Sequence, residues 1–289
     1  MVFDISSKNE AEISLSCETL EVSRSGYYSW LNRPESERAQ ENAVLLTHIR
    51  AQFERSRQTY GSPRITAALK AEGIGVNEKR VARIMNEHEI ASESVKKFKI
   101  KTTDSNHKLA IADRLFETEN VDNIIAPNQV WAADVTYIAT NEGWLFLAVL
   151  LDIFTRKIVG FSSDDNMETN LIMDALEMAL GRQNYREGEL VSHSDRGSQY
   201  ASDDYRKKLM LSGVIASMSR KGNCYDNAHC ESFFHSLKTE LVYRTKFKTR
   251  QEAKQAIFEW IEVWYNRQRL HSSLNYMSPE EYEKMALAA

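Results

Sequence analysis

The stretch HSDRGSQY at residues 193–200 decides the fold when it is combined with the run SRKGNCYDNAHCES at residues 219–232. The apolar and small residues before Asp195 predict a short strand, and the glycine after it marks a turn. Glu231 falls on a predicted helix in the second run. Two carboxylates are therefore held by two rigid elements.

A third acid lies upstream, because the segment WAADVTYI places Asp134 on another predicted strand. Thirty-five residues separate Asp195 from Glu231, and Asp226 or Asn227 can cap the helix that carries Glu231. Acids on a strand, at a strand end and on a helix indicate a site for divalent metal ions, which prefer carboxylate oxygens.

These segments also resemble a known family. WAADVTYI, HSDRGSQY, SRKGNCYDNAHCESFFHSLKTE and NRQRLHSSLNYMSPEEYE are together similar to the downstream-frame (OrfB) transposases of the insertion-sequence-three family, over nearly the whole chain. The resemblance implies an RNase H-like fold, as in retroviral integrases, with Asp134, Asp195 and Glu231 as its Asp, Asp, Glu triad. The chain departs from the family at Tyr225 and at the His-Cys pair before Glu231, but the acid itself is retained.

The resemblance implies DNA cleavage at element ends by water and strand transfer by a 3′-hydroxyl, integrating the element into target DNA. Two Mg²⁺ ions activate the attacking oxygen and stabilise the leaving oxygen in such reactions, and Mn²⁺ is an alternative ion. By position, Asp134 is expected to bridge both ions, while Asp195 and Glu231 each bind one. Other acids are candidates too, since Asp152 follows a predicted buried strand.

Charge is distributed unevenly along the 289 residues, although the formal net charge is only −4. Residues 40–110 carry 13 basic and 8 acidic side chains, residues 111–190 carry 5 and 14, and residues 191–275 carry 14 and 9. Basic flanks that hold DNA around an acidic, metal-binding middle would produce this pattern, and so would solvated helix faces. We find no signal peptide, and the longest apolar run, residues 144–151, is too short to span a bilayer. Three cysteines, an odd number, favour free thiols in a reducing cytoplasm, and the family resemblance implies a bacterial one.

The sequence predicts four regions along the chain. The first, residues 1–39, is predicted to form short helices that are interrupted at Gly26. Residues 40–91 predict a helix-turn-helix DNA-binding domain, with helices starting near Glu41, at Ser62 and after the cap Asn77. A plain three-helix bundle with a solvated basic face is the alternative. Residues 92–127 are expected to be a linker with a lysine-rich front.

Residues 128–289 predict an α/β domain of five strands with flanking helices, and the RNase H-like resemblance implies a mixed sheet with its first strand central. The predicted strands are 129–139, 144–151, 157–161, the strand before Asp195, and 214–218. The intervening helices start at Thr169 and Ser202. After the Glu231 helix, one long helix is expected over 250–267, and a last one opens at Ser278.

The side chains predicted to contact DNA are polar or basic and lie near the acids, on the third helix or in the run 264–271. They are Lys79, Arg80, Arg83, Arg196, Gln199, Arg220, Asn223, Asn227, Lys238, Arg267 and Arg269. Some of these could instead tie loops together. His235 and Lys238 share the helix face of Glu231, and His235 is expected to support the metal ligands. A zinc site is disfavoured, because the cysteines and histidines near Glu231 lack paired CxxC spacing.

The predicted partners are the terminal repeats of the element, target DNA, further copies of this chain, and an upstream-frame product fused by frameshifting. No membrane partner is expected. Two other functions remain open at this point. One is a DNA-binding regulator with an inert RNase H-like domain, and the other is a structure-selective nuclease.

Overall fold

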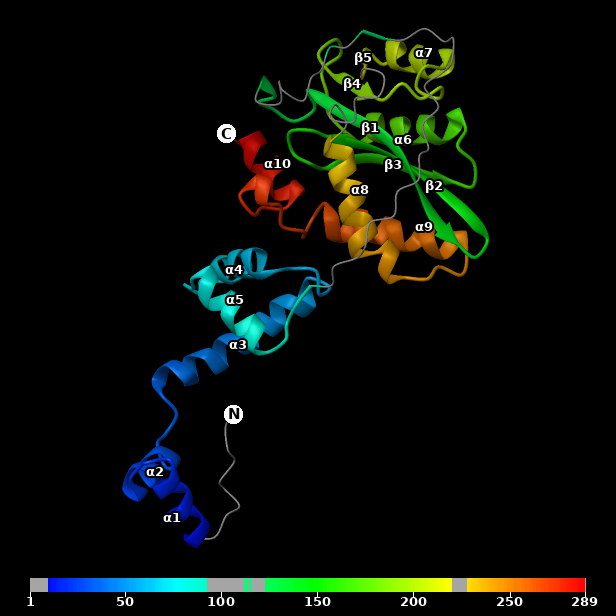
Figure 1. Cartoon of the computed structure of the whole chain (residues 1–289). Coiled ribbons are helices and arrows are strands. Elements are labelled where there is room, and N and C mark those ends of the chain that lie inside the picture. Colours follow the sequence, from blue (N-terminus) through cyan, green and yellow to red (C-terminus); the bar gives the residue numbers. More distant parts are fainter. Residues whose placement is uncertain (1–9, 93–111, 114, 116–122, 220–227, 289) are drawn as a thin grey trace.

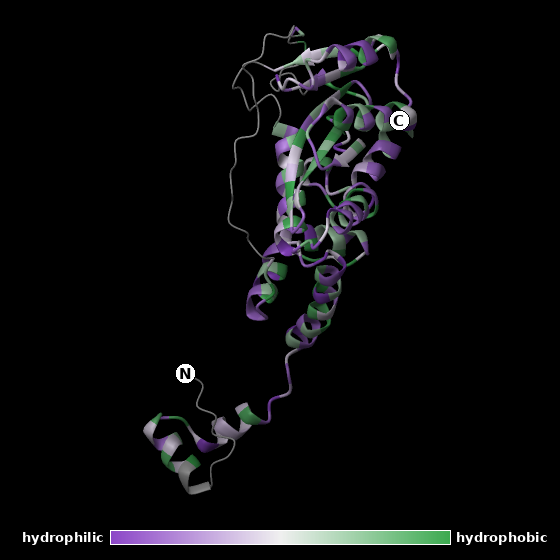
Figure 2. Cartoon of the chain, turned by 90° about the vertical axis from the view of Figure 1, so that its right-hand side faces the viewer, coloured by the Kyte–Doolittle hydropathy of each residue, from purple (hydrophilic) through white to green (hydrophobic). Residues whose placement is uncertain are grey.

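The computed structural model describes residues 10–92, 112–113, 115, 123–219 and 228–288. It has five N-terminal helices followed by a sheet that is enclosed by helices (Figure 1). Figure 2 shows apolar strands inside this second part and more polar helices around them. None of the helices among the described residues combines the length and the apolar character needed to cross a membrane.

The first two helices, α1 (Glu10–Thr19) and α2 (Arg24–Leu31), lie apart from the rest of the protein (Figure 1). The predicted break at Gly26 is wrong, because Gly26 lies inside the first turn of α2. The Ser23 hydroxyl caps this helix by accepting a hydrogen bond of 3.0 Å from the Gly26 amide. A Cβ atom at Gly26 would lie only 2.9 Å from the Ser23 Oγ, so the glycine leaves room for the cap.

Three further helices form the helix-turn-helix region: α3 (Glu37–Arg55), α4 (Ser62–Ala71) and α5 (Glu78–Glu87). The Asn77 side chain caps α5, as its position predicted, by accepting a hydrogen bond of 2.8 Å from the Lys79 amide. The first helix starts at Glu37 rather than near Glu41, because Ser36 caps it by accepting from the Ala39 amide.

The helix-turn-helix region packs directly on the second part of the chain. The Leu270 amide donates a hydrogen bond of 2.7 Å to the Tyr60 hydroxyl, and the Tyr60 ring lies 5.7 Å from the Trp264 ring. An ion pair of 2.9 Å joins Arg57 to Glu259. Buried apolar side chains of α3, α4 and α5 also belong to the same hydrophobic core as those of the sheet, α8 and α9.

The five strands are β1 (Val130–Thr140), β2 (Gly143–Asp152), β3 (Ile158–Asp164), β4 (Val191–Ser194) and β5 (Ile215–Met218). Their order in the sheet is β3-β2-β1-β4-β5. β1 is antiparallel to β2 and parallel to β4. On the outer sides of the sheet, β3 is antiparallel to β2, and β5 is parallel to β4. This confirms the predicted mixed sheet with its first strand at the centre.

Alternating side chains of β1 enter two cores on opposite faces of the sheet. Trp131 and Ala133 pack against α6 (Thr169–Arg182) and α7 (Asp203–Leu211). Val130, Ala132 and Ile138 pack on the other face, which is covered by α8 (Ala228–Glu240) and α9 (Arg250–Glu259). Asp134 shares the parity of Ala132 and therefore lies on the α8 side.

The predicted long helix 250–267 changes its winding part of the way along. α9 continues into a π-helical segment, η4 (Trp260–Tyr265), followed by η5 (Ser272–Leu274) and α10 (Pro279–Ala288). η3 (Val242–Arg244) precedes α9. The wider turn places Asn266 against β3, where its side chain accepts from the Ile158 amide at 2.9 Å and donates to the Ile158 carbonyl at 3.0 Å.

Candidate active site

Asp134 and Asp195 are neighbours because β1 and β4 run parallel. Ala133 and Ser194 are directly paired, and each acid is the next residue along its chain. The Gly197 amide donates a hydrogen bond of 2.8 Å to Asp195 Oδ1, which orients that carboxylate in the turn after β4. Parallel pairing thus brings together two acids that are far apart in the sequence.

Glu231 is supplied by the first turn of α8, which packs across β1. The thiol of the preceding residue, Cys230, is buried and lies 3.5 Å from the Ala132 carbonyl. The Glu231 side chain itself is exposed. The predicted caps Asp226 and Asn227 lie outside the described residues.

The three carboxylates act on one another electrostatically. Burial, together with the charges of Asp195 and Glu231, raises the pKa of Asp134 to about 8, against the opposing effect of the hydrogen bond from the Val135 amide. A desolvated carboxylate with two acidic neighbours is stabilised by a cation. Asp134 thus lies in an environment suited to a bound cation.

The donor set suits a hard divalent ion. All three side chains offer carboxylate oxygens, the ligands that Mg²⁺ and Mn²⁺ take. Within the described ranges, no three acidic, histidine or cysteine side chains converge at metal-ligand spacing. Burial raises the pKa of the Cys230 thiol well above its usual value.

Lys238 lies on the Asp134 side of α8. Its ammonium is 4.7 Å from the centre of the Tyr137 ring. Burial lowers the pKa of Lys238, and the charge of Asp134 opposes that shift. Lys238 also lines a pocket of about 400 Å³ with the aromatic side chains of Tyr137, Trp144 and Tyr243. We did not predict these aromatic residues as part of a site from the sequence. In the structure, Trp144 and Tyr243 are 45% and 40% exposed, which is unusual for large apolar side chains.

Of the other polar residues predicted near the acids, two form hydrogen bonds to backbone carbonyls and one is exposed. Arg196 donates a hydrogen bond of 2.7 Å to the Ser219 carbonyl, and Gln199 donates one of 3.1 Å to the Met167 carbonyl. His235 is exposed one turn along from Glu231. Arg220, Asn223 and Asn227 lie outside the described residues.

Arg269 lies in the interior and not at the surface, where its run of aromatic and basic residues had predicted it. Its side chain is 4% exposed and forms an ion pair of 2.6 Å with Glu240, which is 9% exposed. Burial alone would lower the pKa of Arg269, but the carboxylate of Glu240 raises it above its usual value. The adjacent basic residue of the same run, Arg267, is exposed and lies 3.4 Å from Glu280.

The basic residues predicted on the helix-turn-helix region remain largely at its surface. Lys79 and Arg83 are exposed, and Arg83 lies 3.7 Å from Glu87. Arg80 is tied to α3 through an ion pair of 2.8 Å with Glu41. Arg80 therefore also holds two helices together.

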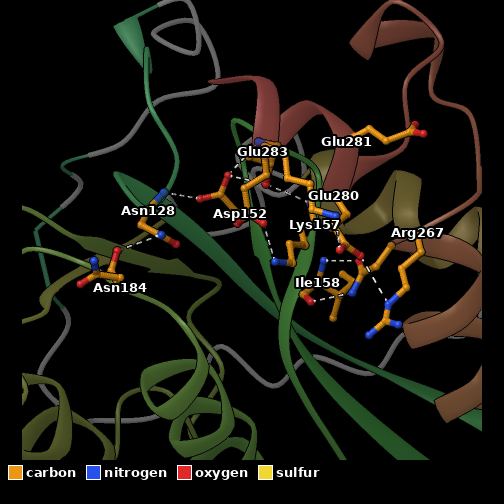
Figure 3. Close-up of polar contacts among 12 residues, drawn as sticks. Asn128, Asp152, Lys157, Ile158, Asn184, Arg267, Glu280, Glu281 and Glu283 are labelled. Carbon is orange, nitrogen blue, oxygen red and sulfur yellow. Dashed lines mark hydrogen bonds and ion pairs between the residues drawn. The ribbon is translucent and has the colours of Figure 1, made fainter. Parts of the chain in front are cut away.

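Asp152 was the main competing acid, and the structure gives it a different task. Its carboxylate accepts hydrogen bonds of 2.7 Å from the Asn128 amide, 2.7 Å from the Thr155 amide and 2.9 Å from the Thr155 hydroxyl. Burial raises its pKa to about 6 against these hydrogen bonds. Figure 3 shows Asp152 beside Lys157, which forms an ion pair of 2.5 Å with Glu283 of α10. Asp152 therefore organises the turn between β2 and β3.

We expect Asp152→Asn to lower the free energy of unfolding by about 1–3 kcal/mol, because the amide nitrogen cannot accept all of these hydrogen bonds. Urea denaturation of both proteins measures this. The matched control is Asp174→Asn on α6, whose side chain is exposed and which should cost less than about 0.5 kcal/mol. Equal stability of Asp152→Asn and wild type would remove the structural role.

Three family models match segments of this chain. An integrase core domain model matches residues 125–224 and a second one matches residues 231–287. An HTH-like domain model matches residues 39–98. Among solved structures, a chain of the simian T-cell lymphotropic virus intasome in complex with PP2A regulatory subunit B56 gamma aligns with a TM-score of 0.47 and 14% identity, covering 75% of this chain and 70% of that chain.

Relatives align over almost their full length. The transposase InsF for insertion sequence IS3A of Escherichia coli (strain K12) is 40% identical over 97% of this chain and 98% of its own. The insertion element IS600 uncharacterized 31 kDa protein of Shigella sonnei is 45% identical over 93% of this chain and 99% of its own. The chain therefore belongs to the insertion-sequence-three family of transposases, DDE polynucleotidyl transferases with an HTH-like region before an integrase core.

Proposed function

We propose that this transposase cleaves DNA at the ends of its insertion element and joins those ends to target DNA, using Asp134, Asp195 and Glu231 as ligands for divalent metal ions. The observation that carries the proposal is the parallel pairing of β1 with β4, which sets the half-buried Asp134 beside Asp195, where the pKa of Asp134 is raised to about 8. Carboxylates that repel one another in this way are costly without a cation, and all three acids lie in the segments that integrase core domain models match.

The metal ions are proposed to be two Mg²⁺, with Mn²⁺ as the alternative. When bound, they activate the attacking oxygen and stabilise the leaving oxygen of the scissile phosphodiester. Asp134 is proposed to bridge the two positions, with Asp195 and Glu231 each serving one. In end cleavage, water would attack the phosphodiester at the element end, whose 3′-oxygen would leave as a hydroxyl; in strand transfer, that 3′-hydroxyl would attack a target phosphodiester, whose own 3′-oxygen would leave.

The remaining residues are proposed to hold DNA. Residues 40–91 would read the element ends through Lys79, Arg80 and Arg83, after the helical segment 1–39, while the linker 92–127 leads to the catalytic region 128–289. Near the acids, the contacts would come from Arg196, Gln199, Arg220, Asn223, Asn227, Lys238 and Arg267, with His235 supporting Glu231. The active assembly would contain several copies of the chain on DNA in the bacterial cytoplasm, joined by frameshifting to an upstream-frame product.

A joining assay tests this function. Purified chain is incubated with Mg²⁺, a labelled duplex that ends in the terminal repeat, and a plasmid target. Joined products that require the repeat are expected. Binding without any joining would favour an inert DNA-binding regulator, and cleavage that ignores the repeat but follows DNA shape would favour a structure-selective nuclease.

Lys238 offers a test of DNA contact. We expect Lys238→Ala to lower the slope of log binding constant against log salt by about one unit, because one phosphate contact is lost. Stability should fall by no more than about 1 kcal/mol, the value of the cation–π contact with Tyr137. Binding of a pre-cleaved end is measured from low to moderate salt, with Lys254→Ala on α9 as the charge-matched control. An unchanged slope with wild-type joining would make Lys238 an ordinary surface lysine.

A further inference from the structure

A second polar pocket lies behind α8, between the catalytic core and the helix-turn-helix region. It has a volume of about 290 Å³ and is lined by Arg64 of α4, Arg156 of the β2–β3 turn, and Arg269 and His271 after η4. α8 contributes His229, Ser232 and Ser236. Four separate elements thus direct basic or hydroxyl side chains to one cavity.

The pocket is separate from the three acids. His229, Ser232 and Ser236 are spaced three and four residues apart, so they share one face of α8. Glu231 is two residues from His229, a rotation of about 200°, and therefore faces the other way. α8 is the wall between the acid cluster and this pocket.

The pocket carries excess positive charge. Arg269 is neutralised by Glu240, whose two oxygens it contacts at 2.6–3.0 Å. Among the described residues, no carboxylate lies within 4.0 Å of the guanidinium of Arg64 or Arg156. Both side chains are only partly exposed, and burial lowers the pKa of each. Glu240 acts on Arg64 and Asp152 acts on Arg156 only from beyond ion-pair distance, and two partly desolvated cations without a direct acidic partner favour an anionic ligand.

Each of the two histidines in the lining accepts from an arginine through one ring nitrogen and carries an N–H donor on the other. Arg156 lies against Nδ1 of His229, and since a guanidinium can only donate, we assign the hydrogen of this imidazole to Nε2. That Nε2 is buried and has no hydrogen-bond partner among the described residues. Arg269 Nη1 likewise lies 3.3 Å from His271 Nε2, which places the hydrogen of His271 on Nδ1. The lining is therefore rich in N–H donors and contains no carboxylate.

We propose that this pocket binds a phosphate group of the DNA backbone, an identity of the anion that rests on the proposed function. The tetrahedral oxyanion matches guanidinium donors, and its charge offsets the excess on Arg64 and Arg156. Arg64 comes from α4, while Arg156, His229 and Arg269 come from the catalytic part. A bound phosphate therefore ties the end-reading helices to the core that carries the acids.

The test uses the full chain without divalent metal, in EDTA. Thermal unfolding is followed while sodium phosphate replaces sodium chloride at constant ionic strength, because a ligand of the folded state raises the midpoint. We expect wild type to be protected and Arg64→Gln to need about ten times more phosphate for the same shift. Lys70→Gln removes one exposed charge from the same helix and should behave as wild type. Arg156→Gln repeats the test from the other wall, and unchanged midpoints in chloride show that each variant folds.

A second arm identifies the source of the phosphate. In wild type, inorganic phosphate should displace an end-DNA duplex more strongly than chloride of equal ionic strength, and Arg64→Gln should lose that difference. Protection by phosphate without displacement of DNA would overturn the DNA assignment and leave a small-anion site. Equal protection of wild type and Arg64→Gln, or none, would overturn the pocket itself.

These experiments distinguish failure of the phosphate pocket from failure of the proposed catalytic function. Glu231→Gln lies on the opposite face of α8 and should keep full protection by phosphate. An enzyme that joins DNA but shows no phosphate protection would refute only the pocket, and protection without any joining in Mg²⁺ would refute only the catalytic proposal.

Discussion

Asp134→Asn, Asp195→Asn and Glu231→Gln should each reduce cleavage and joining by about 10³-fold or more, because losing one metal ligand removes several kcal/mol of transition-state stabilisation. Each change keeps the shape of the side chain and removes its charge. Binding of end DNA should remain within a few fold, since the helix-turn-helix region is untouched. The measurement is a joining assay with pre-cleaved ends, beside a gel-shift titration of the same duplex.

Stability separates this result from simple unfolding. The Asp134 carboxylate is desolvated and repelled by two acids, so Asp134→Asn should not lower the midpoint of thermal unfolding without metal. Asp174→Asn, an exposed acid on α6, serves as the control and should join DNA at the wild-type rate. Turnover near wild type in any of the three variants would exclude that residue from the site.

Glu240→Gln should lower the free energy of unfolding by about 3–5 kcal/mol, because it leaves a buried guanidinium without its counter-charge. Glu240 accepts from Arg269 at 2.6–3.0 Å and from the Trp264 indole at 3.3 Å. Urea denaturation monitored by tryptophan fluorescence measures the loss.

An exposed ion pair provides the comparison. Arg55 and Glu72 are 2.8 Å apart, but their side chains are 66% and 40% exposed. Glu72→Gln should cost no more than about 1 kcal/mol, since solvent screens such pairs. Equal losses for Glu240→Gln and Glu72→Gln would contradict a structural role for the buried pair.

The sequence predicted the sheet well because strand signals there are local. β2 is apolar on both faces, which places it inside a sheet, and Gly143 marks its turn with a φ of +108°. The juxtaposition of Asp134 and Asp195 required the parallel pairing of β1 with β4, which only the family resemblance supplied.

Features that depend on distant partners could not be predicted in the same way. Arg269 has the sequence setting of a nucleic-acid contact, and only folding brings Glu240, 29 residues away, against it. The π-helical turn of η4, which places Asn266 against β3, is not indicated by helical periodicity in the sequence. The pocket behind α8 draws on Arg64 and Arg156, which lie in different domains of the predicted division.

The central claim, that three acids hold the catalytic metal ions, is tested most directly by counting Mn²⁺ bound to the chain on pre-cleaved end DNA by electron paramagnetic resonance. The proposed arrangement predicts about two ions for wild type, about one for Asp195→Asn or Glu231→Gln, and none for the bridging variant Asp134→Asn. Wild-type Mn²⁺ binding by Asp134→Asn would contradict it.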